Sequence, residues 1–374
     1  MAAPKQTGPI AVYGATGFTG TLVAEELKRR EADFVISGRS QGKLDALSMR
    51  LGGVPVAAVS LDDAAGLRSL LEPCAAVIAC AGPFTLHGEP VLAAAAETGT
   101  HYIDTTGEQG FVRMVFDGYG DRAAQNDAAL VTGMGFDYAP GDLIASLTAE
   151  GMGPLDEIVV AYYVRGFGPT RGTALSALEV FRGGDLVWRQ NRWQAAPRSA
   201  DGGSWRFPEP VGEQRTLRYP AGEQITLPKH VETAKVRTLL SGMALPPPPL
   251  ASLAIPMMGL AARTPLKRVA DAVINRMPEG PSEKDRGKSR FMVSCEAKAG
   301  PRVRRGTVAG SDVYGLTAVT TSHAALLAAD PSFDRVGALA PAQAFDPGSF
   351  LDVLADFGVD AEVEPLPEPA AAAR

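Results

Sequence analysis

The fold of this chain is decided by the stretch Val12-Tyr13-Gly14-Ala15-Thr16-Gly17-Phe18-Thr19-Gly20. It follows a short apolar run and precedes a helical pattern, which is the context that a phosphate-binding loop requires. Gly14 permits a tight turn, Gly17 lets the backbone approach a pyrophosphate, and Gly20 allows the helix to pack closely on the strand. The spacing is G-x-x-G-x-x-G, a relaxed form of the dinucleotide fingerprint. A plain strand-turn-helix with incidental glycines is the alternative.

Apolar runs alternate with helical patterns between residue 10 and about residue 149. The expected strands are residues 10–13, 34–37, 54–59, 75–79, 101–104 and 129–132, and the expected helices between them are 19–30, 41–51, 64–71, 88–98 and 118–126. Runs of Val, Ile and Ala with little polar alternation are typical of a sheet that is buried on both faces. The alternation predicts right-handed crossovers and an α/β fold, a doubly wound parallel sheet of the Rossmann type.

The pattern changes after about residue 151. Long β-branched runs are expected as strands at 156–164, 288–297 and 303–311, helices are expected at 171–181, 316–328 and 349–357, and strand fragments are expected within 204–225. The tail at 365–374 is rich in Pro and Ala and is expected to be disordered. We therefore predict a Rossmann domain at 1–140, a mixed-sheet substrate domain at 141–330, and a C-terminal helix with a disordered tail at 331–374.

Composition excludes several classes of protein. The 374 residues carry a net charge of −6 and no run of five basic residues, so nucleic acid is not an expected partner. The three cysteines and four histidines are scattered, which predicts no metal site. The small number of cysteines and the polar N-terminus, which lacks the apolar stretch of a signal peptide, favour a reducing cytoplasm.

One apolar stretch, residues 243–262, approaches membrane-spanning length. It contains five prolines, at 246–249 and 256, and such a density of proline breaks helices. The stretch is expected to form the wall of a hydrophobic substrate channel that also touches a partner protein. A homodimer contact and a membrane-surface contact are the other readings.

The end of the second expected strand distinguishes NADP from NAD. An NAD enzyme typically has a carboxylate there to bind the ribose hydroxyls. This chain instead has Ser37-Gly38-Arg39-Ser40, in which the planar guanidinium of Arg39 suits a 2′-phosphate and Ser40 adds a hydroxyl donor. The segment predicts NADP(H), with a solvated Arg39 as the alternative.

Six motifs in this order resemble the saccharopine dehydrogenase-like oxidoreductases, and within them the trans-acting enoyl reductase branch. The motifs are the glycine loop at 12–20, Gly38-Arg39-Ser40, Ala81-Gly82-Pro83-Phe84, Asp104-Thr105-Thr106-Gly107-Glu108, and the later segments 280–286 and 314–318. The resemblance extends over about residues 10–359. It implies an N-terminal Rossmann domain, NADP(H), and a mixed C-terminal domain that helps to form the substrate site.

The cofactor is expected to lie beyond the carboxyl ends of the strands. The residues expected to bind it are Gly14, Ala15, Thr16, Gly17, Phe18, Thr19, Gly38, Arg39, Ser40, Ala81, Gly82, Pro83 and Phe84. The last four are expected along the nicotinamide ribose, with Phe84 either near the ring or in the core.

Two carboxylates at one strand end, Asp104 and Glu108, are the candidate catalytic residues. Either one could orient a substrate amine or relay a proton. The alternative is that they bind backbone amides or cap the next segment. Asp137 and Tyr138 are expected to face the interdomain cleft, with a helix cap by Asp137 as the alternative. The segment 165–173 is a candidate anion or carbonyl site before a helix, with solvation of its two arginines as the alternative.

Other reductase and hydrolase motifs are missing. No tyrosine is followed four residues later by lysine, and no G-x-S-x-G elbow occurs. We therefore expect an NADPH-dependent reductase of an activated double bond. The branch that the chain resembles implies C=C of a thioester-bound polyketide or lipid intermediate, with an acyl carrier or a polyketide synthase as partner. Saccharopine reductase-like C=N reduction of an amino or oxo acid, and a non-catalytic NADP-binding scaffold, are the alternatives.

Overall fold

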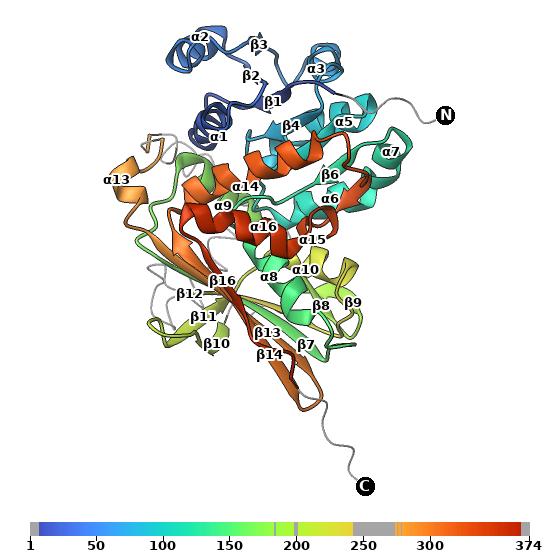
Figure 1. The fold of residues 1–374 in the computed structure, drawn as a ribbon, viewed down its shortest axis with the longest axis vertical. Coiled ribbons are helices and arrows are strands. Elements are labelled where there is room, and N and C mark those ends of the chain that lie inside the picture. The colour runs from blue at the N-terminus through green and yellow to red at the C-terminus, as the bar shows by residue number, and fades with distance from the viewer. Residues whose placement is uncertain are drawn as a thin grey trace.

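The computed structural model describes residues 7–182, 185–197, 201–241, 274, 276–277 and 279–367. Two large sheets divide the molecule, one drawn at the top of Figure 1 and the other below it. The apolar stretch at 243–262 and the end of the tail, 368–374, lie outside the described residues. No helix in the described part is long and apolar enough to cross a membrane.

The first sheet has seven parallel strands in the order β15-β6-β5-β4-β1-β2-β3. The strands are β1 (Ile10–Tyr13), β2 (Phe34–Gly38), β3 (Val56–Ala58), β4 (Ala76–Ala79), β5 (His101–Asp104), β6 (Ala129–Val131) and β15 (Gly337–Leu339). The direction of winding reverses between β1 and β4, and dinucleotides bind at such a switch point. The predicted doubly wound parallel sheet is confirmed.

Helices cover both faces of this sheet, because side chains alternate between the faces along each strand. On one face, Ile10 and Val12 of β1 pack with α1 (Phe18–Arg29), α2 (Gln41–Arg50) and α14 (Val313–Ala328). On the other face, Ala11 and Tyr13 pack with α3 (Ala64–Leu71), α5 (Glu89–Thr98) and α6 (Gln109–Gly118). The sequence prediction missed α6. Its buried residues Phe111, Val112 and Val115 have helical spacing, so a signal was present.

The second sheet is mixed, as predicted, in the order β10-β11-β12-β7-β13-β14-β16. Its strands are β7 (Glu157–Arg165), β10 (Asp201–Arg206), β11 (Glu213–Arg218), β12 (Val236–Ser241), β13 (Arg290–Ala299), β14 (Arg302–Ser311) and β16 (Asp360–Val363). The pair β12–β7 is parallel and the other pairs are antiparallel. The central helix α8 (Ala139–Ala149) packs on β13 and β14.

Shorter elements surround the two sheets. They are α7 (Gly120–Gln125) and α4 (Phe84–His87) in the first half of the chain, α9 (Arg171–Arg182), the hairpin of β8 (Leu186–Arg189) and β9 (Arg192–Ala195), α10 (Glu223–Thr226), η1 (Leu227–Lys229) and α13 (Glu283–Arg286). The hairpin and β12 were not predicted, because each is short and is bounded by polar residues.

The C-terminal part differs from the prediction of a helix and a tail at 331–374. It contains β15, α15 (Pro341–Ala344), α16 (Pro347–Leu354), η2 (Ala355–Phe357) and β16. Because β15 extends the first sheet and β16 extends the second, this segment belongs to both halves of the molecule. A strand of three residues carries no periodic pattern, which is why the sequence did not reveal it.

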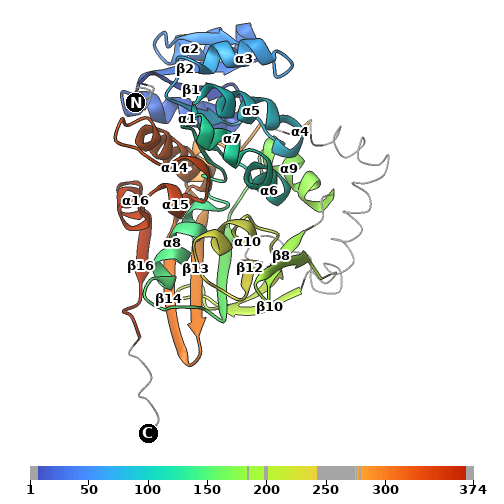
Figure 2. The same ribbon diagram turned by 90° about the vertical axis from the view of Figure 1, so that its right-hand side faces the viewer.

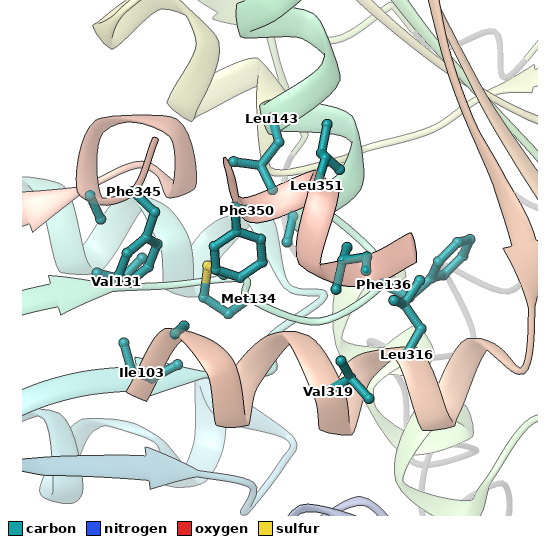
Figure 3. Close-up of a cluster of buried hydrophobic side chains, with 14 of the residues drawn as sticks. Ile103, Val131, Met134, Phe136, Leu143, Leu316, Val319, Phe345, Phe350 and Leu351 are labelled. Atoms are coloured by element: carbon teal, nitrogen blue, oxygen red, sulfur yellow. The ribbon is translucent and has the colours of Figure 1, made fainter. Parts of the chain in front are cut away.

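A continuous apolar core joins the two halves. Figure 3 shows Met134 and Phe136, from the segment after β6, between α14 and the C-terminal helix that carries Phe350 and Leu351. These side chains are at most 5% exposed and belong to one cluster that also includes residues of both sheets. The two halves of the molecule are therefore held together by a packed apolar core.

Candidate functional site

The glycine loop connects the carboxyl end of β1 to α1. Gly14 has a φ of +82°, and a Cβ added there would lie 3.0 Å from the backbone nitrogen of Ala81 in the loop after β4. A Cβ on Gly20 would lie 2.3 Å from the carbonyl oxygen of Gly14. Glycine is therefore required at both positions, because the two strand-end loops and the helix approach one another so closely.

The N-terminus of α1 is open. Its N-cap, Gly17, is exposed and makes no side-chain capping bond, and no acidic residue lies in the first turn. The first N–H groups of a helix have no acceptors within the helix, and together with the helix dipole they bind anions. Thr16 and Thr19 are partly exposed beside them. This loop fits a pyrophosphate.

The adenosine end of the site lies at the carboxyl end of β2. Gly38 is buried, yet nothing lies within 4 Å of the position that a Cβ would take, so free space adjoins the backbone. Arg39 is exposed, and within the described residues its guanidinium has no ion-pair partner. Ser40 is the N-cap of α2 and makes no side-chain capping bond. These residues fit an adenosine ribose that carries a 2′-phosphate.

Backbone hydrogen bonds hold the two ends of the site together. The amides of Gly14 and Ala15 both donate to the carbonyl oxygen of Ser37, at 2.9 and 3.1 Å. Ala15 is fully buried, so it contributes to the site through its backbone. The pyrophosphate loop and the adenosine end are thereby fixed relative to each other.

In the loop after β4, the exposed residues are small, so mainly backbone atoms are available to a cofactor. Gly82 is exposed and Ala81 is partly exposed, whereas Pro83 is buried. The Phe84 ring is 4% exposed and packs on Phe111 with 5.5 Å between the ring centroids. Phe84 therefore lies in the core, which is one of the two positions expected for it.

Glu108 is fully engaged by hydrogen bonds. It is 1% exposed, and its carboxylate accepts from the amides of Phe84 (2.7 Å) and Thr85 (2.8 Å), from the Thr85 hydroxyl, and from the Ser176 hydroxyl (2.8 Å). The first two donors belong to the first turn of α4. The carboxylate therefore caps this short helix, which is the alternative weighed for it above.

Asp104 is likewise fully buried. Its carboxylate accepts from the amides of Thr106 (2.9 Å) and Gly133 (2.8 Å) and from the Thr132 hydroxyl (3.0 Å). Burial raises the pKa of Asp104 to about 6, and these hydrogen bonds oppose the rise. The side chain ties the loop after β5 to the loop after β6, as expected of a carboxylate that binds backbone amides.

Asp137 differs from the other two carboxylates because it is partly exposed. It follows β6, its Oδ1 accepts from the Tyr219 hydroxyl at 3.3 Å, and its Oδ2 lies 3.1 Å from the Cβ position of Gly107. The surrounding protein raises the pKa of Asp137 by desolvation, against the Tyr219 hydrogen bond, which lowers it. A raised pKa extends the pH range over which the carboxyl group can donate a proton, as a general acid requires.

Tyr219 was missed by the sequence analysis. It directly follows β11 in the second sheet, and its ring packs edge-on against Tyr162, with centroids 5.8 Å apart. Burial and the nearby Asp137 raise the pKa of Tyr219 well above its usual value, so the hydroxyl stays protonated. No motif marks this tyrosine, because its partner lies 82 residues away in the chain.

A buried polar cluster adjoins this pair. The Tyr162 hydroxyl donates to Glu223, which is 0% exposed, and burial raises the pKa of Glu223 well above its usual value. Tyr138, expected to face the cleft, is instead 1% exposed, because it packs against the Cα positions of Gly133 and Gly222. The cluster packs against the Asp137–Tyr219 pair through the Tyr162 ring.

The segment at 165–173 does not present a free cation from Arg171. The Arg171 guanidinium donates to the carbonyl oxygen of Met277 at 2.8 Å, and the Thr170 amide donates to the Tyr314 hydroxyl at 2.8 Å. Both groups hold the segment against other parts of the chain. The segment stays a candidate anion site in which Arg171 is already held by a backbone carbonyl oxygen.

Comparison with known proteins agrees with this geometry. Residues 10–131 match the family described as "Saccharopine dehydrogenase NADP binding domain". A Mycobacterium tuberculosis protein, provisionally named a trans-acting enoyl reductase, is 37% identical over 193 residues, which cover 48% of this chain and 46% of the relative. A Bos taurus saccharopine dehydrogenase-like oxidoreductase is 29% identical over 187 residues, which cover 45% of this chain and 44% of that protein. The matches thus span less than half the length of these relatives.

A solved structure extends the likeness in fold to the whole chain. The L-Glu-forming saccharopine dehydrogenase of Saccharomyces cerevisiae superimposes with a TM-score of 0.62, covering 96% of this chain and 100% of that chain at 12% sequence identity. At this identity the match shows the fold alone. Residues 10–131 thus match the NADP-binding domain of the saccharopine dehydrogenase family, and the chain as a whole shares the saccharopine dehydrogenase fold.

Proposed function

We propose that this protein is an NADPH-dependent reductase of an activated double bond, and that its substrate is the C=C bond of a thioester-bound polyketide or lipid intermediate. One observation carries the proposal. The partly exposed Asp137 carboxyl, paired with Tyr219 of the second sheet, lies at the same carboxyl edge of the first sheet as the cofactor loops.

The reaction needs a hydride and a proton. NADPH, when bound, supplies the hydride to one carbon of the double bond. The Asp137 carboxyl then gives its proton to the neighbouring carbon and is left as a carboxylate, which water reprotonates. Tyr219 orients the carboxyl group by donating to Oδ1. The balance is one hydride and one proton added across one C=C bond.

Asp104 and Glu108 take a different role in this proposal. Both carboxylates are buried and saturated with donors from the protein, so neither has a path to a substrate. We assign them to positioning the loops that follow β4, β5 and β6.

The preference for C=C over C=N rests on charge. An oxo acid or amino acid substrate needs cations for its carboxylates, and two of the candidate cations are already engaged by protein groups: Arg171 donates to the Met277 carbonyl oxygen, and Arg286 lies 3.4 Å from Asp312. The site instead presents a carboxyl group and tyrosine rings. A neutral thioester chain suits it better, and the names of the mycobacterial relatives agree.

A thioester-bound substrate implies a carrier. We propose an acyl carrier protein or a polyketide synthase as the partner that delivers it in the cytoplasm, and a second copy of the chain as a further partner. Mixing the protein with an acyl carrier and measuring the mass of the complex tests the first, and the mass of the protein alone tests the second.

The central test is a screen of NADPH oxidation against enoyl thioesters and against imines formed from an amine and an oxo acid. Wild-type protein is expected to oxidise NADPH with an enoyl thioester. Asp137→Asn should lower kcat by about 10²–10⁴-fold, the usual contribution of a general acid, with NADPH affinity unchanged. Turnover with imines alone supports the C=N alternative, and NADPH binding without turnover of either class supports a scaffold.

A further inference from the structure

A helix of the second half of the chain reaches the cofactor site. The Ser176 hydroxyl of α9 donates to Glu108 at 2.8 Å, and its oxygen lies 3.4 Å from the Cβ position of Gly82. Figure 2 shows α9 beside α4 and α6. Gly82 opens the loop that follows β4, so α9 lies directly against one of the loops that surround the switch point of the first sheet.

Glu108 links Ser176 to the backbone of the loop after β4. Its carboxylate holds the amides of Phe84 and Thr85 at 2.7 and 2.8 Å, and also the Thr85 hydroxyl. Hydrogen bonds to a charged acceptor are the strong ones, and in a buried place they are not weakened by water. The position of α9 and the path of residues 82–85 are therefore coupled through one carboxylate.

This loop serves one end of the dinucleotide site. In a doubly wound sheet the dinucleotide crosses the switch point between β1 and β4, with adenosine toward β2. Arg39 follows β2, whereas Gly82 follows β4 on the opposite side of the glycine loop. The coupling through Glu108 thus concerns the nicotinamide end and not the adenosine end.

We infer that Ser176 is a positioning residue for the nicotinamide half of bound NADP(H): α9 holds Glu108, and Glu108 holds the loop at 82–85. The family's cofactor domain ends at residue 131, so this contribution comes from outside it. The inference depends on the cofactor site and not on the proposed substrate, so it stands or fails separately from the proposed reaction.

Two ligands separate the halves of the site. NADPH occupies both halves, whereas 2′,5′-ADP carries only the adenosine and its 2′-phosphate. The dissociation constants of both are measured by calorimetry for wild type, Ser176→Ala and Ser176→Thr. Loss of a hydrogen bond to a charged group predicts an affinity for NADPH about tenfold lower in Ser176→Ala. The same variant should bind 2′,5′-ADP as wild type does, and Ser176→Thr, which keeps a hydroxyl, should restore most of the NADPH affinity.

Two further variants serve as a negative and a positive control. Thr98→Ala removes a partly buried hydroxyl at the end of α5, where it contacts Ala94 and Thr100 but not Glu108, so both affinities should stay near wild type. Arg39→Ala should weaken the binding of both ligands, because both carry the 2′-phosphate.

Three outcomes would overturn the inference: unchanged NADPH affinity in Ser176→Ala, equal loss for both ligands, or an equal effect from Thr98→Ala. A second variant, Thr85→Val, covers the case in which Ser176→Ala does not fold. It removes the Thr85 hydroxyl that donates to Glu108, and it should weaken the binding of NADPH but not that of 2′,5′-ADP. If it weakens neither ligand, or both equally, the coupling through Glu108 is wrong.

Discussion

Three carboxylates lie at the carboxyl edge of the first sheet, and their surroundings give them different properties. Asp104 and Glu108 are at most 1% exposed and are saturated with protein donors, whereas Asp137 is partly exposed and meets one tyrosine hydroxyl. The same chemical group therefore serves as a structural tie in two places. We propose it as an acid only in the third.

We expect Arg39 to determine which dinucleotide the protein prefers. Arg39→Ala removes charge-assisted hydrogen bonds to the 2′-phosphate and is expected to weaken NADPH binding by about 1–3 kcal/mol. NADH, which lacks that phosphate, should lose far less. Titration of protein fluorescence with each cofactor measures the difference, and equal losses for the two cofactors would show that Arg39 does not read the phosphate.

Aromatic packing at the element scale covers the start of α1. The Phe18 ring meets the Tyr314 ring of α14 edge-on at 5.1 Å, and Tyr314 stacks on Phe167 at 5.4 Å. The Tyr314 hydroxyl also donates to the carbonyl oxygen of Gly168 and accepts from the Thr170 amide. The glycine loop is thus held from the side of the second half of the chain.

A pair of substitutions separates the ring from the hydroxyl. Tyr314→Phe keeps the ring contacts and leaves the Thr170 amide without its acceptor, so it should lower the free energy of unfolding by about 1–3 kcal/mol. Tyr314→Ala also removes a ring that is 8% exposed, and should cost about 3–5 kcal/mol. Urea unfolding measures both. If the two variants are equally stable, the ring contacts contribute nothing.

One buried carboxylate joins distant parts of the whole molecule. Asp142 of α8 accepts from the Thr226 hydroxyl (2.7 Å), from His230 Nε2 (3.1 Å) and from the Ala342 amide of α15 (2.9 Å). Burial raises the pKa of Asp142, but the charge and hydrogen bond of His230 outweigh it, and the net pKa is lowered. Burial lowers the pKa of His230, and Asp142 outweighs that effect, so the net pKa is raised.

The two shifts give a pH window for stability. The raised pKa of His230 contributes stability that is complete below its unfolded value, about 6.5, and is lost as the pH rises through the folded value. The lowered pKa of Asp142 contributes stability that is complete above its unfolded value, about 3.9, and is lost as the pH falls through the folded value. The pair therefore stabilises the fold most between about pH 4 and 6.5.

His230→Asn tests this window. It should lower the free energy of unfolding at pH 6 by about 1–3 kcal/mol and flatten its decrease above pH 6.5. His87→Asn, at an exposed position, is the control and should leave the profile unchanged. Thermal unfolding followed across the pH range measures both variants. A wild-type profile in His230→Asn would mean that the pair does not couple folding to pH.

Local features of the amino-acid chain predicted six strands of the first sheet, its glycine loop and NADP(H) as the cofactor: a buried strand is apolar throughout, a tight turn needs glycine, and Arg39 follows directly on β2. Only the tertiary structure decided which carboxylates are ties, where β15 pairs, and that Tyr219 meets Asp137 and Ser176 meets Glu108. Those contacts join residues 82 and 68 positions apart. A pattern with a period of two or 3.6 residues reports which face of an element is buried, and says nothing about which distant side chain packs against it.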